Sequence, residues 1–250
     1  MSANFKSLSS YPLQKSFRYY DLILGAYVCV LLCSNLIGPA KVALVQVPPF
    51  GGITFVAGVL FFPISYIFGD ILTEVYGYAR DRRCVWAGFM ALAFASVMAT
   101  VIVHLPAAPF WQHGSSLGID RQAAVEEIFG STPRIVMASM IAFWCGSFVN
   151  SFVLAKMKIA TEGRWLWSRI IGSTLCGELV DSVLFYTIAF LYVFPMAELV
   201  QVTVTQYVLK SGWEILMTPV TYRVVGFLKR VESEDYFDHT TDFTPFSLKA

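Results

Sequence analysis

The stretch that decides the fold is Val85–His104, which reads VWAGFMALAFASVMATVIVH. Among its twenty residues only the last, His104, has an ionisable side chain. A helix of this length is about 30 Å long, which matches the hydrocarbon core of a bilayer. Because the segment is apolar all round and has no polar face, it predicts a membrane-spanning helix.

Five more apolar stretches of similar length flank this segment on both sides. They run over Tyr20–Ile37, Ile53–Glu74, Arg134–Leu154, Arg169–Phe194 and Leu199–Leu228. Each is about as long as a membrane span. The sequence therefore predicts an all-α, polytopic membrane protein, with a bundle of six transmembrane helices over residues 20–228.

The overall composition agrees with this class. Apolar residues make up 56% of the chain and charged residues 14%, against about 45–50% and about 25% in soluble domains. Such a chain has too few charges to cover a soluble surface, so the lipid bilayer is an expected partner. A net charge of +1 without a long basic run argues against nucleic acid as a partner, and five cysteines without a CxxC pair argue against a disulfide scaffold.

Basic residues outside the spans orient the chain, because they resist translocation. With a cytoplasmic N-terminus, 14 of the 18 Lys and Arg residues lie on the cytoplasmic side. We therefore expect two cytoplasmic termini: an N-terminal segment over 1–19, and a polar tail over 229–250 that is able to dock onto the inner face. The long external connection, 105–133, contains residues 120–129, which form either a short amphipathic helix or a plain loop.

Ionisable side chains inside the spans are the first candidates for a function. Each costs about 2.5–3.5 kcal/mol to insert, so it persists only in the bundle interior or in a water-filled cavity. Asp70 and Glu74 share one face of the second span with Tyr66, because residues four apart lie one above the other on a helix. Glu74 has an alternative structural role as the ion-pair partner of a nearby arginine: Arg80, Arg82 or Arg83.

The fifth span carries a second pair of carboxylates, Glu178 and Asp181, near the middle of the bilayer. Their spacing of three residues also places them on one helix face. The alternative to a functional role is an internal charge pair with Lys210 or Arg223 of the sixth span. The tetrapeptides GDIL at 69–72 and GELV at 177–180 are alike and lie three spans apart, which predicts an inverted 3 + 3 repeat.

Further polar side chains that would line a shared cavity lie in the first, fourth and sixth spans: Asn35, Trp144, Asn150, Gln206, Lys210, Trp213 and Glu214. Carboxylates accept hydrogen bonds from adjacent N–H donors, and aromatic rings stack on flat ligands. The set therefore suits a planar, nitrogen-rich ligand. The same carboxylates are suited to carry protons or a cation, and the residues alone leave these alternatives open.

The motifs of intramembrane enzymes are missing from the sequence. Its three histidines form no HExxH motif, and neither GxSxG nor GxxxxGK[ST] occurs. The pair Glu178 and Asp181 lacks the ExxH spacing of di-iron bundles. We therefore expect a transporter rather than an enzyme, without catalytic residues, cofactor or metal, and any use of ATP would need a partner protein.

Several motifs are similar to those of the bacterial queuosine precursor transporters of the vitamin uptake (VUT) family. The longest and most specific is Phe62–Tyr78, FPISYIFGDILTEVYGY. Shorter matches follow in order: TPR at 132–134, Asn150, TxGR at 161–164, WxR at 167–169, ST at 173–174, DS at 181–182, Phe185 and TPxTY at 218–222. The resemblance covers about residues 35–246, nearly the whole chain.

The resemblance implies an importer in the bacterial inner membrane. Its substrate would be a 7-deazaguanine base, 7-cyano-7-deazaguanine (preQ0) or its aminomethyl relative preQ1, salvaged for queuosine in tRNA. The N–H edge of such a base suits a carboxylate, and the amine of preQ1 suits a second one. The predicted substrate-binding residues are Asp70, Asp181, Glu178, Tyr66, Glu74, Asn35, Asn150 and Trp144.

The resemblance leaves alternatives open. One is a transporter for another small vitamin-like heterocycle, and another is the binding subunit of an energy-coupling system, whose small six-span subunits are similar in size. Transport is then facilitated diffusion with metabolic trapping, proton-coupled transport, or transport driven by ATP through a partner. Assembly into a homo-oligomer is open as well.

Overall fold

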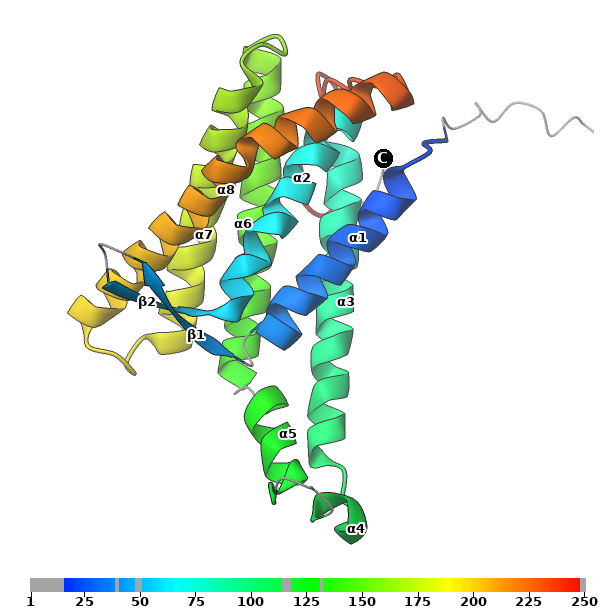
Figure 1. Ribbon diagram of the computed structural model, residues 1–250. Helices are drawn as coiled ribbons and strands as arrows, with labels where there is room; N and C mark the ends of the chain where they lie inside the picture. Colours follow the sequence, from blue (N-terminus) through cyan, green and yellow to red (C-terminus); the bar gives the residue numbers. More distant parts are fainter. Residues whose placement is uncertain (1–15, 39–40, 48–50, 114–117, 131–132, 248–250) are drawn as a thin grey trace, which may run out of the picture.

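The computed structural model describes residues 16–38, 41–47, 51–113, 118–130 and 133–247 as a bundle of mostly long helices (Figure 1). The mainly helical architecture confirms the coarse prediction of an all-α protein. Three lysines of the charge count, Lys6, Lys15 and Lys249, lie outside the described residues, as does Thr132 of the family resemblance.

The helices, in chain order, are α1 (Tyr20–Leu32), a π-helical continuation η1 (Cys33–Ile37), α2 (Phe62–Tyr76), α3 (Tyr78–His104), α4 (Pro109–Gln112), α5 (Arg121–Phe129), α6 (Pro133–Ala160), α7 (Leu166–Phe190) and α8 (Met196–Glu232). Between η1 and α2 lie β1 (Val42–Val47), β2 (Gly51–Val56) and the short 3-10 helix η3 (Ala57–Leu60).

Four segments of the described chain are long and apolar enough to cross a membrane on their own. They are Tyr20–Ile37, Tyr78–His104, Leu166–Phe190, and the segment 121–160 that holds α5 and α6. Helix α2 has 15 residues and is about 22 Å long, shorter than the hydrocarbon core. Helix α8 is long enough, but Lys210 and Glu214 interrupt its apolar run. The count of six spans therefore stays a prediction.

The predicted helix Ile53–Glu74 is wrong in its first part. Residues 53–56 belong to β2, which pairs antiparallel with β1 so that Val42 lies opposite Val56 and Val47 opposite Gly51. Two adjacent glycines, 51 and 52, disfavour a helix, and the following β-branched and aromatic residues favour a strand. Helix α2 begins only at Phe62, with Pro63 in its first turn, where a missing N–H costs nothing.

Other boundaries also differ from the prediction. Helix α7 ends at Phe190 rather than Phe194, and α8 continues through Glu232, past the predicted start of the tail at 229. In the long connection the helical alternative is the correct one, because α5 forms. Asp120 caps α5 by accepting hydrogen bonds from the backbone N–H groups of Gln122 (2.9 Å) and Ala123 (3.2 Å).

Helix α2 is the centre of the bundle. It packs against α1, α3, α6 and α8, and Figure 1 shows it in cyan between α1 and the α6–α8 side. Twelve of its 15 residues are buried. Short as it is, α2 carries both Asp70 and Glu74 into the interior, so its surroundings determine what these two carboxylates can do.

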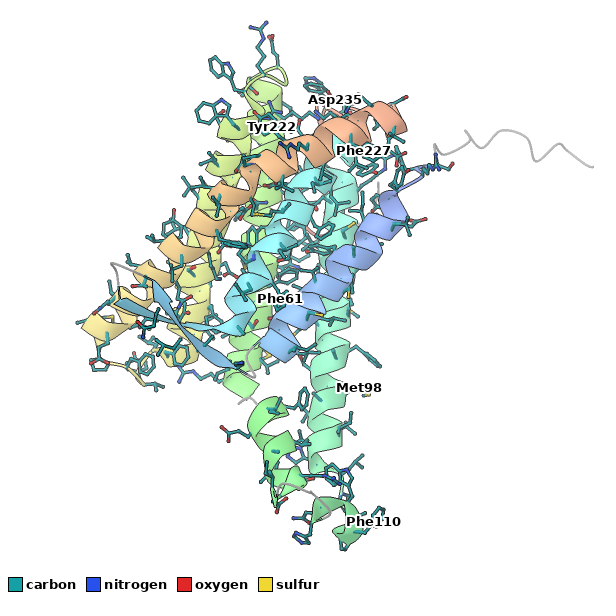
Figure 2. The ribbon with its side chains drawn as sticks, in the orientation of Figure 1. Phe61, Met98, Phe110, Tyr222, Phe227 and Asp235 are labelled. Atoms are coloured by element: carbon teal, nitrogen blue, oxygen red, sulfur yellow. The ribbon has the colours of Figure 1, made fainter. Side chains whose placement is uncertain are left out.

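The two ends of the bundle are different. We call the end where α4 and α5 lie the loop end; Met98 and Phe110 mark the part of α3 and α4 that projects there (Figure 2). At the opposite end, the tail end, the backbone N–H groups of Arg18 and Tyr19 donate to the carboxylate of Glu232 at 3.0 and 2.7 Å. The start of α1 and the end of α8 therefore meet at one end of the bundle.

The tail, residues 233–247, packs onto the tail end of α2, α3 and α6. The backbone N–H of Tyr236 donates to the carbonyl of Val75 (3.3 Å), and Arg82 donates to the carbonyls of Asp242 and Thr244 at 2.7 and 2.6 Å. Gly77 joins α2 to α3 with a φ of 90°, and a Cβ there would overlap the ring of Tyr236. The prediction that the tail can dock onto the bundle is confirmed.

Candidate functional site

Asp70 and Asn150 meet in the middle of the bundle. The Asn150 side-chain amide on α6 donates to Oδ1 of Asp70 on α2 at 2.9 Å. Both side chains are buried, with exposed fractions of 0% and 1%. Asp70 Oδ2 and Asn150 Oδ1 have no hydrogen-bond donor among the described residues. The pair therefore presents two buried acceptor atoms to which no described residue donates a hydrogen bond.

Glu214 of α8 completes this pair from the other side. Its side chain lies within hydrogen-bonding reach of the Asp70 side chain. Glu214 Oε1 accepts a hydrogen bond from the Thr174 hydroxyl at 2.7 Å, and Oε2 has no donor in the described structure. The prediction of binding residues omitted Glu214, although its side chain is as deeply buried as that of Asn150.

Glu178 and Asp181 of α7 face Lys210 of α8. The Lys210 ammonium lies 2.6 Å from Asp181 Oδ2 and 3.5 Å from Glu178 Oε2. The alternative of an internal charge pair with Lys210 is therefore correct for both, with the shorter contact to Asp181. Glu178 is fully buried, and neither of its oxygens receives a hydrogen bond from the described residues. We call Asp70, Glu178, Asp181 and Glu214 the carboxyl cluster.

Tyr66 fits beside this cluster because small residues let α6 and α7 approach each other closely. A Cβ on Gly177 would lie 2.8 Å from the Asn150 Cβ and 3.0 Å from the carbonyl of Gly146. A Cβ on Gly146 would overlap the Tyr66 hydroxyl and lie 2.9 Å from the Asp181 Cβ. The Tyr66 hydroxyl is buried without a partner among the described residues. The two glycines therefore bring the tyrosine, the amide and the carboxylates together.

A small polar cavity lies beside Tyr66 and Asn150. It is lined by Tyr27, Ser65, Tyr66, Gly69, Val85, Ser147, Asn150 and Ser151. Its volume for the centre of a water molecule is about 10 Å³, which is room for about one water. Of the predicted binding residues, Tyr66 and Asn150 line this cavity, which has no room for a base.

Glu74 lies one turn from Asp70 in very different surroundings. Its Oε1 lies 2.7 Å from Arg169 Nη2, 2.6 Å from Lys229 Nζ and 3.7 Å from Lys158 Nζ. The alternative of an ion pair with Arg80, Arg82 or Arg83 was wrong in its partners, because α2 turns its Glu74 face toward α6, α7 and α8 rather than along the chain to α3. Glu74 instead belongs to a group of ion pairs that joins α2 to α6, α7 and α8.

The tail contributes a second carboxylate to this group of ion pairs. Asp235 Oδ1 lies 2.6 Å from Lys158 Nζ and 2.8 Å from Lys229 Nζ, and Figure 2 shows Asp235 at the tail end. Partial burial alone would raise the pKa of Asp235, but hydrogen bonds from the two lysines outweigh it and lower the pKa. We call Glu74, Asp235, Lys158, Arg169 and Lys229 the Glu74 ion cluster.

The structure does not bring Asn35 and Trp144 to the carboxyl cluster. Asn35 accepts a hydrogen bond from the Ser139 hydroxyl (2.7 Å) and donates to the carbonyl of Leu31 (2.9 Å), which ties η1 to α6. Trp144 packs its ring against Trp86 of α3. It lies six residues from Asn150, about 120° around α6, and so on a different face of that helix.

Lys210 and Glu214 were predicted to line the cavity but were left out of the predicted binding residues, although a signal for both was present in the sequence. Lys210 and Glu214 lie four apart on α8, as Asp70 and Glu74 do on α2, so both pairs share a helix face. A second charged pair in an apolar stretch points to the bundle interior in the same way as the first. The partners of Glu74 carry no such signal, because they come from three other helices.

Comparison with known proteins fits this architecture. The family described as "Putative vitamin uptake transporter" matches residues 56–224, about two thirds of the chain and all of the carboxyl cluster. The chain belongs to this family. As a vitamin uptake transporter family member with long apolar helices, it is a multi-pass membrane protein of the transporter class.

A curated relative gives a more specific name. Over 193 residues the chain is 29% identical to the "Probable queuosine precursor transporter" of Bacillus subtilis (strain 168), which covers 76% of this vitamin uptake transporter family chain and 78% of the relative. No solved structure matches the chain. The queuosine precursor transporter resemblance that the motifs carry is confirmed.

Proposed function

We propose that the chain imports a queuosine precursor, a 7-deazaguanine base such as preQ0 or preQ1, across the bacterial inner membrane. The name of the Bacillus subtilis relative supports the substrate class. The observation that carries the proposal is the carboxyl cluster with its buried acceptor oxygens, next to a buried tyrosine and an amide. Such a set fits the N–H edge and the flat face of a guanine-type base.

We also propose six membrane crossings with both termini in the cytoplasm. The meeting of Arg18 and Glu232 at the tail end supports an even number of crossings. Helix α2 is too short to cross alone, so η3, which directly precedes it, would lengthen its passage. The positive-inside rule then assigns the tail end to the cytoplasm.

Glu178 is the proposed reader of the substrate edge. A carboxylate presents two acceptor oxygens, which match two adjacent N–H donors on the base. Glu178 is fully buried, and the described protein donates no hydrogen bond to either oxygen. Lys210 lies 3.5 Å from Oε2, close enough to stabilise the negative charge but without a well-formed hydrogen bond to either oxygen.

Tyr66 and Asn150 are proposed to complete the contacts. The ring of Tyr66 reaches the α6–α7 contact between the two glycines, where it offers a flat surface for stacking. Asn150 holds Asp70 with its amide N–H and keeps its carbonyl oxygen free for a donor on the base. Asp181 acts by holding Lys210 in place.

Entry of a base requires the helices to move. The cavity beside Tyr66 and Asn150 holds about one water, whereas small-molecule sites usually enclose about 300 Å³ or more. We therefore propose that the structure represents a closed state, and that α6 and α7 separate from α2 and α8 to open the site to one side at a time, as in other transporters with midplane sites.

Uptake by purified protein in liposomes tests this proposal. Wild-type protein should take up labelled preQ0 or preQ1, and the label recovered from the lumen should be the unaltered base. Glu178→Gln removes the charge but keeps the size, and the loss of a charge-assisted pair should lower uptake about tenfold to a hundredfold. The matched control Glu198→Gln, at an exposed position of α8, should transport normally. Normal uptake by Glu178→Gln would contradict the proposed site.

A further inference from the structure

The small cavity beside Tyr66 and Asn150 is enclosed by four helices, α1, α2, α3 and α6. Apart from Gly69 and Val85, every residue that lines it carries a hydroxyl or an amide group: Tyr27, Ser65, Tyr66, Ser147, Asn150 and Ser151. Its volume for the centre of a water molecule is about 10 Å³. The cavity is therefore polar and has room for one group of about the size of a water molecule.

Two serines on the wall of this cavity already use their hydrogen atoms within the protein. The Ser65 hydroxyl donates to the carbonyl of Phe62 at 2.6 Å, and the Ser151 hydroxyl donates to Oδ2 of Asp81. A hydroxyl has one hydrogen atom and two lone pairs. Toward an occupant of the cavity, both serines are therefore left as acceptors.

Asn150 and Tyr66 add further acceptors. The side-chain N–H of Asn150 donates to Oδ1 of Asp70 at 2.9 Å, which fixes the orientation of the amide. Its Oδ1 is buried and has no donor among the described residues. The buried hydroxyl of Tyr66 has no partner in the described structure either, so its oxygen is able to accept. The cavity therefore presents mainly hydrogen-bond acceptors.

Two buried carboxylates lie directly behind this wall. Asp70 is bonded to Asn150 and Asp81 to Ser151, so each is one hydrogen bond away from the cavity. Both are 0% exposed, and neither forms an ion pair in the described structure. Arg82, next to Asp81 in the chain, donates to carbonyls of the tail instead. Because the surroundings are out of water, the two carboxylates make the cavity favourable for a positive charge.

We propose that this cavity is a subsite for an ammonium group of the substrate, and that the chain therefore prefers a flat base with a primary amine, such as preQ1, over one with a nitrile, such as preQ0. The inference rests on the proposed function and narrows its substrate class. An ammonium group is compact, is about as large as a water molecule, and has three donors and no acceptor. It matches the cavity in size, in charge and in hydrogen bonding.

A nitrile does not match the same cavity. Its nitrogen only accepts hydrogen bonds, so it would face other acceptors without a donor between them. Sites that are built to bond one polar group reject an analogue that leaves their buried groups unpaired. The rings of Tyr27 and Tyr66 on the cavity wall favour the cation as well, because aromatic rings attract cations to their faces.

The ammonium subsite and Glu178 divide the recognition of the base between them. Glu178 binds the N–H edge, which preQ0 and preQ1 share, and the cavity binds the substituent, in which they differ. Tyr66 connects the two regions. It lines the cavity, and its ring lies 3.0 Å from the position of a Cβ on Gly177, the residue before Glu178. The closed structure thus holds a place for the ammonium group, and the ring system enters when the helices separate.

Binding of labelled bases to the purified protein tests the inference without transport. Wild-type protein should bind preQ1 about tenfold to a hundredfold more tightly than preQ0, the range for hydrogen bonds that involve a charged group. Gly69→Ala takes room from the cavity without strain, because its Cβ would lie 3.8 Å from Asn150 Nδ2 and 3.9 Å from Asp81 Oδ1. This variant should bind the two bases with similar affinity. The matched control Gly212→Ala, whose Cβ meets no atom within 4 Å, should keep the preference for preQ1.

Two amide variants separate the ammonium subsite from the edge of the base. Asp70→Asn removes a negative charge behind the cavity and should lower the affinity for preQ1 to about that for preQ0. Glu178→Gln should weaken the binding of both bases and leave the ratio of their affinities as in wild type. Glu198→Gln, at an exposed position of α8, should bind both as wild type does.

The outcomes distinguish this inference from the proposed function. If wild-type protein neither binds nor transports either base, the proposed function fails. If it binds preQ0 as tightly as preQ1, or if Gly69→Ala keeps the full preference for preQ1, the proposed function stands and the ammonium subsite is wrong.

A free inorganic cation is the other occupant that fits the same chemistry. In that case NaCl, compared with choline chloride at equal ionic strength, would raise the unfolding temperature of wild-type protein and not that of Gly69→Ala, and preQ1 would have no advantage over preQ0. That result would overturn the ammonium subsite. We expect equal unfolding temperatures in the two salts and a rise with preQ1 that is larger than the rise with preQ0.

Discussion

Asp70 and Glu74 lie one turn apart on α2 and are both fully buried, yet their surroundings are opposite in charge. Asp70 meets an amide and a second carboxyl group, Glu214, and one of its oxygens has no donor in the described structure. Glu74 meets Arg169, Lys229 and Lys158, all within 3.7 Å of one oxygen. Two carboxylates on the same helix face therefore differ in their partners. Asp70 has too few donors and no cation beside it, whereas Glu74 is surrounded by three cations.

This difference assigns the two clusters different roles: the carboxyl cluster binds the ligand, and the Glu74 ion cluster stabilises the helix bundle. The Glu74 ion cluster joins α2, α6, α7, α8 and the tail at one end of the bundle, so any movement there breaks several ion pairs at once. The carboxyl cluster contains buried oxygen atoms without a hydrogen-bond donor in the described structure, and these can bind a ligand. Helix α2 is thus held by ion pairs at its C-terminal end, while its middle carries a carboxylate oxygen that is available to a ligand.

The largest expected effect comes from breaking the Glu74 ion cluster. Arg169→Leu removes a fully buried cation and should lower the free energy of unfolding by about 3 kcal/mol, within the range for a broken buried pair. Denaturation in mixed micelles measures the change. Arg230→Leu, at an exposed position that bonds within its own helix, should change the free energy of unfolding by less than about 0.5 kcal/mol. Equal stability of the two variants would show that the Glu74 ion cluster does not stabilise the helix bundle.

A smaller effect is expected from crowding the carboxyl cluster. A methyl group at Gly146 overlaps the Tyr66 hydroxyl and presses on α7, so Gly146→Ala should destabilise the protein by about 1–3 kcal/mol and reduce uptake. Gly212→Ala on α8, where a Cβ meets no atom within 4 Å, is the control and should leave both unchanged. If Gly146→Ala transports at the wild-type rate, Tyr66 does not need its present position.

The smallest effect concerns the tail. Asp235 is 48% exposed, so the loss of its ion pairs in Asp235→Asn should cost less than about 1 kcal/mol. Because bonds from Lys158 and Lys229 lower the pKa of Asp235 in the folded state, its stabilisation is present above the unfolded-state pKa of about 3.9 and is lost as the pH falls through the folded-state value. The stability difference between wild type and variant should therefore disappear in acid. A difference that grows in acid would contradict this.

Much of the fold was predictable because hydrophobic length is a local signal. The segment Val85–His104 lies within α3 of the structure, and the helical nature of the first, fourth, fifth and sixth stretches was also predicted correctly. The hairpin before α2 was missed because a run of apolar β-branched residues looks the same in a helix and in a buried strand. The glycines at 51 and 52 were the available sign.

The site was predictable in its members but not in its pairing. Charges in apolar segments identify Asp70, Glu178 and Asp181, because burial of a charge needs a reason. Which carboxylate meets which partner depends on how α8 lies against α2, and no local pattern encodes that. The prediction that Glu74 forms an ion pair with an arginine was therefore right, but the arginine is Arg169. Trp144 was predicted to line the cavity, but it packs against Trp86 instead.

Two isosteric amide variants test the central claim most directly. Asp70→Asn and Glu74→Gln each change one carboxylate to an amide, one turn apart, and their thermal unfolding and uptake of labelled base are measured side by side in the same liposomes. The account predicts that Asp70→Asn unfolds at the wild-type temperature but takes up little labelled base, whereas Glu74→Gln unfolds at a clearly lower temperature. If Asp70→Asn takes up labelled base normally, or if Glu74→Gln is as stable as wild type, the division between the two clusters is wrong.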